Sequence, residues 1–430
     1  MEALFIRQIR IVNPAQGEDF VGDLYIENGR IQAMGKMLFD VQKDGKAELQ
    51  VIQGKNLVAA PGLVDLHVHL RDPGFPDKEN IFTACRAAAA GGVTSLLAMP
   101  NTAPSMDSPQ QIQDLLDRGK KADAHVYTTG CITKGLRGEE LCDLAALHEA
   151  GAVAFSDDGR PVLQANQLLE ALVQAEKLGA LVTAHCEDLT AAGEGIMHMG
   201  AVSQILGVPG IPSEAEESGT FRDLRIAAMK GLPIHICHVS LETVAAEIRK
   251  AKQRGEPVTA ETAPHYLLLT EEALLKRDAD YRMNPPLRRE RDRQAMIQGL
   301  LDGTIDVIAT DHAPHTPKEK ENFETAPNGV IGMEQSLSAV LTAMDGLANL
   351  SQVITWMSVN PAKLLGIPGG VLKQGAVADL VLFDPEEEYT VDPNRLHGKS
   401  KNTAFKGMTL KGKVKYTICG GRLVFSDKAM

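Results

Sequence analysis

Histidine and aspartate residues stand at the carboxyl ends of short apolar runs across the middle of this 430-residue chain. The first run ends His67-Val68-His69-Leu70-Arg71. Because side chains alternate along a strand, His67 and His69 share one face, and Arg71 follows on that side if the strand continues. Four further runs end in residues of the same kinds, which are Asp157-Asp158, His185, His238 and Asp311-His312. Imidazole and carboxylate groups are the ligands that zinc and related divalent metals take in proteins.

The elements that must position these side chains are strands of a parallel sheet. Eight runs are apolar almost throughout, as in strands buried on both faces: Gly62–His67, Val93–Met99, His125–Gly130, Ala152–Ser156, Leu181–His185, Ile234–His238, Val258–Glu261 and Asp306–Thr310. Helical patterns such as Ile81–Ala90 and Gln164–Leu178 fall between them. Eight βα repeats predict an α/β fold, a (β/α)8 TIM barrel with its active site at the carboxyl ends of the strands. The spacing lengthens after the fifth and seventh runs, so residues 187–220 and 265–300 are expected to be insertions on that face.

The prediction of a metal site depends on the conjunction of these signals. An isolated His-x-His is more often incidental, and a lone His is often a core residue bonded to a carbonyl group. Here five of the eight predicted strands end in a ligand-type residue, at the one face where barrels do chemistry. Four His and two Asp supply enough donors for two divalent metals. The pattern alone does not choose between Asp157 and Asp158.

Both ends of the chain have the character of β structure. The predicted strands are Leu4–Val12, Gly22–Glu27, Arg30–Met34 and Gln50–Ala59 near the start, and Asp379–Phe383, Gly412–Cys419 and Arg422–Phe425 near the end. Asn28-Gly29 is a two-residue hairpin signal. Because chain termini commonly lie close together, we expect one small β domain built from residues 1–58 and 367–430, flanking a barrel of residues 59–366.

Composition excludes several classes of protein. The net charge is 44 − 56 = −12, with no basic cluster of the kind that binds nucleic acid. No apolar run approaches the ~20 residues needed to cross a bilayer, and the first residues do not resemble a secretory signal. Six Cys without a C-x-x-C pair are typical of reduced thiols, which favours a cytoplasmic location. The Glu214–Glu217 stretch is typical of a solvated helix start.

Longer blocks give the sequence a family resemblance. They are PGLVDLHVHLRDPG at 61–74, AMPNT at 98–102, FSDDG at 155–159, AHCED at 184–188, ICHVS at 236–240, TAPHY at 262–266 and ATDHAPH at 309–315. The chain resembles the metal-dependent amidohydrolases and, within them, the long-form (class I) bacterial dihydroorotases. His-Leu-Arg-Asp-Pro-Gly together with Met-Pro-Asn-Thr is the specific part of this match, whereas His-x-His marks only the superfamily.

The resemblance implies a metal-ligand set. Carried over by position, it makes His67, His69 and Asp311 ligands of one Zn²⁺ and His185 and His238 ligands of a second. Asp158 would bridge the two ions, which gives two zincs per subunit. Relatives such as dihydropyrimidinases and allantoinases bridge their metals with a carboxylated Lys, and the fourth strand here has none.

The resemblance also implies the reaction and its partners. The activity would be reversible hydrolysis of the cyclic amide of (S)-dihydroorotate to N-carbamoyl-L-aspartate, in de novo pyrimidine (UMP) biosynthesis. Asp311 would carry the proton as the catalytic residue. The substrate-binding residues would be His69, Arg71, Asn101, Asn284, His315, Gly329 and Val330. A homodimer is expected, and some active members associate with aspartate transcarbamoylase.

Two other functions remain open at this point. One is a different cyclic amidase of the hydantoinase or allantoinase type, against which the missing Lys and the His-Leu-Arg block both count. The other is an inactive dihydroorotase-like subunit that scaffolds aspartate transcarbamoylase. Such a chain is expected to lose metal ligands, and all six are present here.

Overall fold

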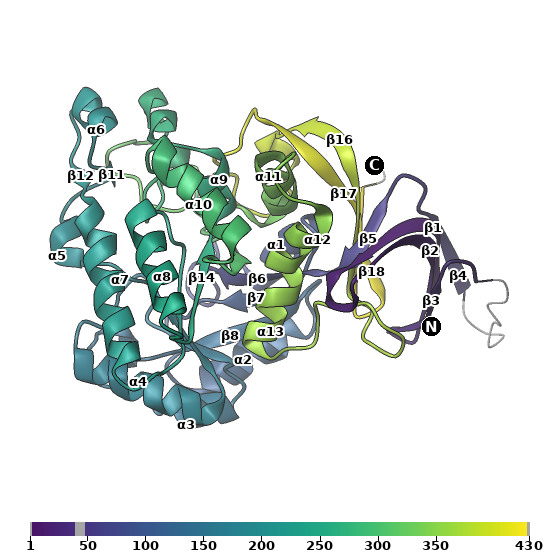
Figure 1. Cartoon of the computed structure of the whole chain (residues 1–430), viewed down its shortest axis with the longest axis horizontal. Helices are drawn as coiled ribbons and strands as arrows, with labels where there is room; N and C mark the ends of the chain where they lie inside the picture. Colours follow the sequence, from purple (N-terminus) through teal and green to yellow (C-terminus); the bar gives the residue numbers. More distant parts are fainter. Residues whose placement is uncertain (1, 39–47, 428–430) are drawn as a thin grey trace.

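Eight short parallel strands form the barrel in the middle of the chain, in the computed structural model that describes residues 2–38 and 48–427. Their order around the sheet is the order of the chain. Figure 1 shows β6, β7 and β8 beside one another, partly covered by the helices. The strands are β6 (Leu63–Val68), β7 (Val93–Ala98), β8 (His125–Cys131), β9 (Ala154–Ser156), β10 (Leu181–Ala184), β13 (Ile234–Ile236), β14 (Val258–Thr262) and β15 (Val307–Ile308). All eight strands predicted from the apolar runs are therefore confirmed.

The first and last barrel strands meet through a buried aspartate. Asp65 of β6 accepts hydrogen bonds from the backbone N–H of Thr310 at 3.0 Å and from its hydroxyl at 2.5 Å. The backbone N–H of His69 donates to the carbonyl oxygen of His312 at 2.8 Å. These contacts close the ring and bring the carboxyl ends of β6 and β15 together.

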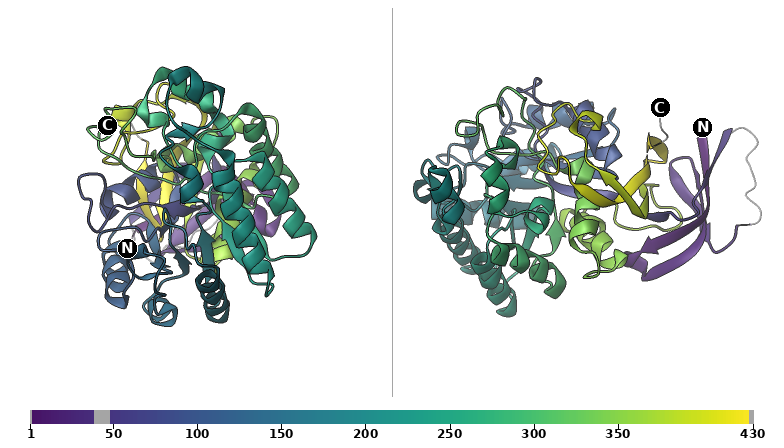
Figure 2. Two further views of the ribbon diagram at one scale, coloured as in Figure 1. Left: turned by 90° about the vertical axis from the view of Figure 1, so that its left-hand side faces the viewer. Right: turned by 90° about the horizontal axis from the view of Figure 1, so that it is seen from above.

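Helices pack against the outside of the barrel, and those of the teal and green part of the chain face the viewer in Figure 2 (left). They are α1 (Ile81–Ala90), α2 (Pro109–Gly119), α3 (Leu144–Glu149), α4 (Ala165–Leu178), α7 (Ser213–Ala228), α8 (Glu242–Gln253), α10 (Glu290–Asp302), α11 (Ser336–Ala343), α12 (Leu350–Ile354) and α13 (Asn360–Leu365), with a π-helical turn at Thr355–Val359. Both helices whose bounds the sequence predicts are confirmed. α1 begins and ends at the predicted residues, and α4 begins one residue later than predicted. Asn80 caps α1 by accepting from the backbone N–H of Thr83 at 3.1 Å.

The predicted insertions are shorter than expected. Within 187–220 the extra elements are α5 (Leu189–Ala192), β11 (Met197–His198), α6 (Ala201–Leu206) and β12 (Gly210–Ile211). Within 265–300 they are α9 (Pro264–Leu268) and 3-10 turns at Glu271–Lys276 and Ala279–Tyr281. The remaining parts of both stretches belong to α7 and α10, which are ordinary outer helices of the barrel. Other 3-10 turns lie at Pro14–Gln16, Lys134–Leu136, Met333–Gln335 and Pro393–Arg395.

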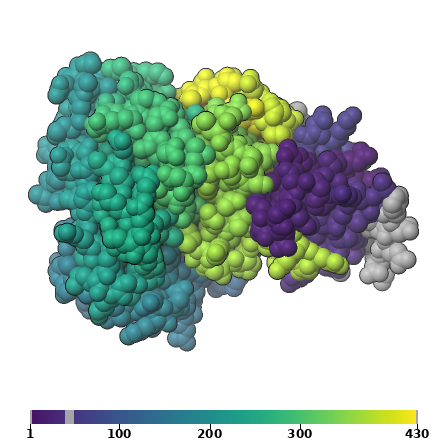
Figure 3. Space-filling view, in the orientation of Figure 1, coloured from purple at the N-terminus to yellow at the C-terminus, as the bar shows by residue number. Residues whose placement is uncertain are grey.

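The two ends of the chain form one mixed sheet beside the barrel, which confirms the predicted small β domain. Its strands are β1 (Glu2–Asn13), β2 (Glu18–Glu27), β3 (Arg30–Gly35), β4 (Glu48–Gln53), β5 (Val58–Pro61), β16 (Leu380–Thr390), β17 (Thr409–Cys419) and β18 (Arg422–Ser426). The order is β18-β17-β16-β5-β1-β2-β3, and β4 pairs with β1. In the space-filling view the purple N-terminal segment covers the right-hand end of the molecule, with yellow C-terminal residues beside it (Figure 3).

The hairpin prediction holds, and one strand prediction is wrong. Asn28 and Gly29 join β2 to β3 with φ of 53° and 76°, the left-handed pair that a type I′ turn requires. The expected single strand Gln50–Ala59 is instead two strands, β4 and β5, which pair one after the other with β1. The break falls at Gly54, where a Cβ atom would lie 2.5 Å from Cβ of Ile9.

Among the described residues, no helix is long and apolar enough to cross a membrane.

Candidate metal centre

All six predicted metal ligands lie together at the carboxyl ends of the barrel strands. His67 belongs to β6, and the other five follow their strands by one to three residues. The carboxylate of Asp158 is the centre of the group. Its oxygens lie 3.3 Å from His67 Nε2, 3.5 Å from His69 Nε2, 3.5 Å from His185 Nδ1 and 4.0 Å from His238 Nε2.

Asp311, which follows the last barrel strand, is the sixth member of the group. Oδ1 of Asp311 lies 3.1 Å from Nε2 of His69 and 3.6 Å from Nε2 of His67. His67, His69 and Asp158 have donor atoms within 4.8 Å of one another, and so do Asp158, His185 and His238. Asp158 is therefore shared by two adjoining three-donor groups.

Two observations indicate that these donor atoms are suited to binding a divalent metal. Nε2 of His67 and Oδ1 of Asp158 are buried, and neither atom has a hydrogen-bond partner among the described residues. In addition, Nδ1 of His185 and Nε2 of His238 face each other at 2.9 Å. Burying unpartnered polar atoms is costly, and a cation among them would satisfy the lone pairs that they present.

Electrostatics keeps the carboxylate donors ionised and divides the histidines. Burial lowers the pKa of His67, but the charge of Asp158 outweighs it and raises that pKa well above its usual value. Burial raises the pKa of Asp311, but the hydrogen bond from His69 and the charge of His67 outweigh it and hold that pKa at about 2. Burial raises the pKa of Asp158, but the charge of His67 and the nearby imidazoles of His185 and His69 outweigh it and hold that pKa well below its usual value. Burial and the charge of His185 lower the pKa of His238 to about 3. Burial lowers the pKa of His185, but Asp158 and Glu187 outweigh it and raise that pKa to about 10. A metal requires ionised carboxylates and neutral imidazoles, so metal binding would displace protons from the histidines whose pKa is raised.

Asp157 has a different role from Asp158. Its Oδ1 accepts from the backbone N–H groups of Ile132 and Thr133 at 2.8 and 3.0 Å, and its Oδ2 accepts from the hydroxyl of Thr133. Asp157 therefore anchors the loop after β8. Of the two candidates that the sequence left open, only Asp158 faces the four histidines.

Asn101 lies between two of the ligands rather than apart from them. Its Oδ1 is 2.9 Å from Nδ1 of His69, and its Nδ2 donates to Oδ2 of Asp158 at 3.1 Å. Asn284, also predicted to contact substrate, donates to both carboxylate oxygens of Glu187 at 3.0 Å. Glu187 in turn lies 3.1 Å from Nε2 of His185. Both asparagines are thus connected to metal-ligand candidates.

Arg71 and His315 lie next to each other beside the centre. Nε of Arg71 donates to the carbonyl oxygen of Pro314 at 3.1 Å, and its Nη2 lies 3.3 Å from Nε2 of His315. The strand does not reach Arg71, however, because β6 ends at Val68. A loop with a left-handed φ of 58° at Arg71 positions it instead. Arg71 does not pair with its neighbour Asp72, which instead accepts from Nη1 of Arg118 at 2.7 Å.

Gly329 and Val330 border His315. A Cβ atom on Gly329 would lie 3.0 Å from Nε2 of His315, and its φ of 131° also favours glycine. The N–H of Gly329 donates to the carbonyl oxygen of Arg282 at 2.9 Å, and the carbonyl of Val330 accepts from Ala313 at 2.8 Å. These bonds hold the segment against the end of β15. Its contact with a substrate stays a prediction.

Left-handed backbone conformations occur at this end of the barrel. Three non-glycine residues here have left-handed φ, namely Arg71 at 58°, His238 at 37° and Asp311 at 49°. Such conformations cost about 1–3 kcal/mol each and persist where the surroundings over-determine them. Two of the three are metal-ligand candidates, so the strain directs donor atoms into the centre.

One buried residue that the sequence reasoning missed is Glu261. Its Oε1 lies 2.8 Å from Nδ1 of His67, and its Oε2 lies 3.2 Å from Nε2 of His235. The signal was available, because Glu261 ends the seventh apolar run as the ligand candidates end theirs. His312, which follows Asp311 and is outside the predicted ligand set, uses its Nδ1 to accept from the backbone N–H of Gly332 at 3.2 Å.

Comparison with known proteins agrees with this architecture. The sequence model of the amidohydrolase family matches residues 58–424. Dihydroorotases from Citrifermentans bemidjiense and Pelotomaculum thermopropionicum are 45% and 44% identical to this chain, over 98% and 99% of it and 99% of each relative.

Solved structures give the same fold. A dihydropyrimidinase from Brevibacillus agri matches with a TM-score of 0.85 at 26% identity, covering 100% of this chain and 96% of that one. An L-hydantoinase from Arthrobacter aurescens, 24% identical, has a TM-score of 0.87 over 100% and 97% of the two chains and supports the fold alone. The chain therefore belongs to the amidohydrolase family and, within it, to the dihydroorotases.

Proposed function

We propose that this protein hydrolyses the cyclic amide of dihydroorotate, reversibly, to N-carbamoyl-L-aspartate, as a step of pyrimidine biosynthesis. The observation that carries the proposal is the gathering of four His around Asp158, with Asp311 beside His67 and His69, in a chain 45% identical to a dihydroorotase over nearly its whole length. The reaction adds water across the ring C–N bond, so it needs an activated water, a polarised carbonyl and a proton donor for the leaving nitrogen.

In this proposal His67, His69 and Asp311 would hold one zinc, His185 and His238 would hold a second, and Asp158 would be shared by both. A bound zinc ion supplies Lewis acidity and lowers the pKa of water to about 7, so that a nucleophile exists at neutral pH. The ionised Asp311 is placed to take a proton from the attacking water. It then gives that proton to the ring nitrogen as the amide bond breaks.

The substrate carries a carboxylate, which a protein of net charge −12 repels at long range. We assign its recognition to Arg71, whose planar guanidinium suits a carboxylate and stands beside the proposed centre. His315 lies against the same guanidinium. Contacts with the rest of the substrate are assigned to His69, Asn101, Asn284, Gly329 and Val330.

A substrate comparison tests the function. The zinc-loaded protein is expected to hydrolyse dihydroorotate and not hydantoin, dihydrouracil or allantoin, and a chelator is expected to abolish the activity until zinc is restored. Hydrolysis of hydantoin or allantoin instead would establish the other cyclic amidase. No hydrolysis at all would favour the scaffold, for which co-elution with aspartate transcarbamoylase is the measurement. A cytoplasmic location, a homodimer and the domain boundaries 1–58, 59–366 and 367–430 belong to the same proposal.

A further inference from the structure

A chain of buried hydrogen bonds leads from the metal centre through the inside of the barrel. It begins at Nδ1 of His67, 2.8 Å from Oε1 of Glu261. Oε2 of Glu261 lies 3.2 Å from Nε2 of His235, and Nδ1 of His235 lies 2.8 Å from the hydroxyl of Thr259. His67, Glu261 and His235 are almost completely buried, with exposed fractions of 1%, 1% and 0%.

The direction of each bond follows from the chemistry of the groups. A carboxylate only accepts hydrogen bonds, so Nδ1 of His67 and Nε2 of His235 must both donate to Glu261. A neutral imidazole that donates through one nitrogen accepts through the other. With both rings neutral, as a metal ligand must be, the hydroxyl of Thr259 donates to His235, and Nε2 of His67 presents a bare lone pair. That nitrogen is the atom that faces Asp158 and has no partner among the described residues.

We propose that Glu261 and His235 are positioning residues of the metal centre, which fix the ring and the tautomer of His67 so that Nε2 is presented as a ligand. The inference rests on the proposed function, because it takes His67 as a metal ligand. A carboxylate behind a metal-binding histidine orients the ring and increases its basicity, and removing such a partner typically costs 10- to 100-fold in metal affinity or activity.

Register explains why these residues meet. β13 and β14 are parallel neighbours in which His235 pairs with Thr259. Glu261 lies two residues further along β14, on the same face as Thr259, and so reaches the layer of His67. The barrel interior thus holds a polar column at this point, where apolar branched side chains usually fill TIM barrels.

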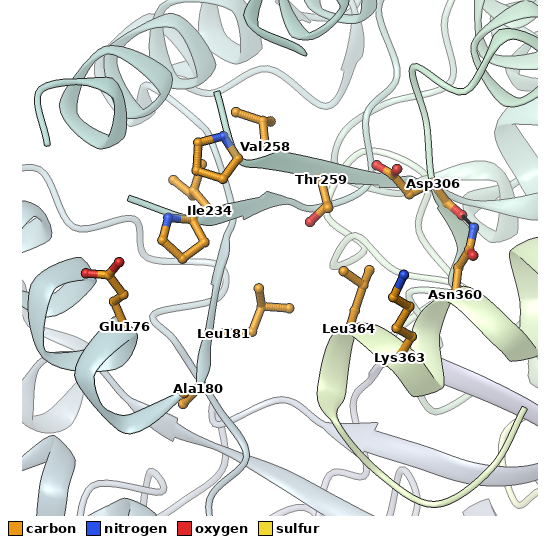
Figure 4. A pocket seen from close by; sticks show the side chains of 13 residues that line it. Glu176, Ala180, Leu181, Ile234, Val258, Thr259, Asp306, Asn360, Lys363 and Leu364 are labelled. Atoms are coloured by element: carbon orange, nitrogen blue, oxygen red, sulfur yellow. Dashed lines mark hydrogen bonds between the residues drawn. The ribbon is translucent and has the colours of Figure 1, made fainter. Parts of the chain in front are cut away.

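The far end of the column is open to the opposite face of the barrel. Thr259 lines a cavity of about 550 Å³ at the amino-terminal ends of the strands, together with Leu181, Ile234, Val258 and Asp306. Figure 4 shows Thr259 among these side chains. A substitution at Thr259 therefore reaches the column without touching a metal-ligand candidate.

Three variants test the inference. Glu261→Gln keeps the size of the side chain but removes one of the two acceptor oxygens, and Thr259→Val removes the hydroxyl at the far end. The matched control is Thr183→Val. Thr183 is the residue of β10 that pairs with His235, and its buried hydroxyl has no hydrogen-bond partner among the described residues.

The measurement is zinc affinity by competition with a chromophoric chelator, together with the absorption spectrum of the cobalt-loaded protein and kcat/KM at saturating zinc. We expect Glu261→Gln to weaken zinc binding about 10- to 100-fold and to alter the cobalt spectrum. Thr259→Val should weaken zinc binding about two- to tenfold, the effect of one neutral hydrogen bond, and Thr183→Val should match the wild type.

The outcomes separate the inference from the function on which it rests. Wild-type zinc affinity and cobalt spectrum in a folded Glu261→Gln protein would overturn the positioning role. If that variant does not fold, an unchanged Thr259→Val protein, or one equal to Thr183→Val, would overturn it in the same way. If the wild-type protein itself binds no divalent metal, the proposed function fails.

Discussion

Oδ1 of Asp311 lies 3.1 Å from Nε2 of His69, although 242 positions separate the two residues in the chain. The contact joins the end of the last barrel strand to the end of the first. It holds an ionised carboxylate at the edge of the proposed metal centre, since the neighbouring histidines keep the pKa of Asp311 at about 2. A carboxylate in that position can both bind a metal and accept a proton from water.

Replacing Asp311 by Asn should therefore abolish proton transfer with little change in shape. Positioned acid–base groups contribute about 10²- to 10⁴-fold, so we expect kcat for dihydroorotate to fall by about two to four orders of magnitude. The thermal unfolding temperature of the variant serves as the control for folding. Near-normal turnover in Asp311→Asn would show that another group carries the proton.

The adjacent residues Asp157 and Asp158 provide a matched pair. Asp158→Asn removes the carboxylate that faces all four histidines, and the zinc content should fall. Asp157→Asn should keep its zinc but lose stability by about 1–3 kcal/mol, because it disturbs buried bonds to Ile132 and Thr133. Metal analysis and urea unfolding of both variants are the measurements. A loss of zinc from Asp157→Asn alone would reverse the assignment of the bridge.

Arg71→Met tests the recognition of the substrate carboxylate. A charge-assisted contact contributes about 1.5–3 kcal/mol, so kcat/KM for dihydroorotate should fall about 10- to 100-fold. Arg71→Lys should restore only part of the loss, because an ammonium group lacks the planar fork. Zinc content should not change.

The control for Arg71 is Arg118→Met. This variant removes the guanidinium that pairs with Asp72, the residue after Arg71 in the chain. We expect this variant to keep the wild-type kcat/KM. Wild-type efficiency in Arg71→Met, or an equal loss in both variants, would place the carboxylate contact elsewhere.

Stability should depend on pH through His125. A hydrogen bond to Asp379, with Nε2 3.0 Å from Oδ1, raises the pKa of His125 from 6.5 to about 10. Since the folded pKa is the higher one, the stabilisation is fully present below pH 6.5 and is lost as the pH rises through about 10. Urea unfolding between pH 6 and pH 10.5 should show a smaller decline in His125→Gln than in the wild type. Parallel curves for the two proteins would contradict this role.

Much of the fold could be predicted because the barrel strands are short, apolar and separated by helical patterns. The ligand candidates could be found for a related reason, since a polar residue that ends a buried strand must lie at the barrel mouth. Asn28-Gly29 predicted its hairpin because few residues adopt two left-handed conformations in succession.

Features that depend on long-range contacts were not predictable in the same way. Arg71 lies beside the centre through a loop conformation and not through strand alternation. Glu261 has its role because it meets His67, 194 positions away. The composition of Glu214–Glu217 predicts a solvated helix start, and this prediction is wrong for Glu216. Its side chain is 5% exposed and forms an ion pair with Arg288 at 3.1 Å. In each case the partner, and not the local sequence, decides the environment.

The bond between Asp65 and Thr310 has a consequence for biosynthesis, because it unites residues 245 positions apart. A nascent chain that has just exposed His67 and His69 cannot yet hold the complete set of metal donors. At about 5–20 residues per second, roughly 12–50 seconds of translation must pass before Asp311 is made. Completion of the centre is therefore a late event that accompanies closure of the ring, and a chain terminated before that point would leave the ribosome without Asp311, the proposed proton carrier.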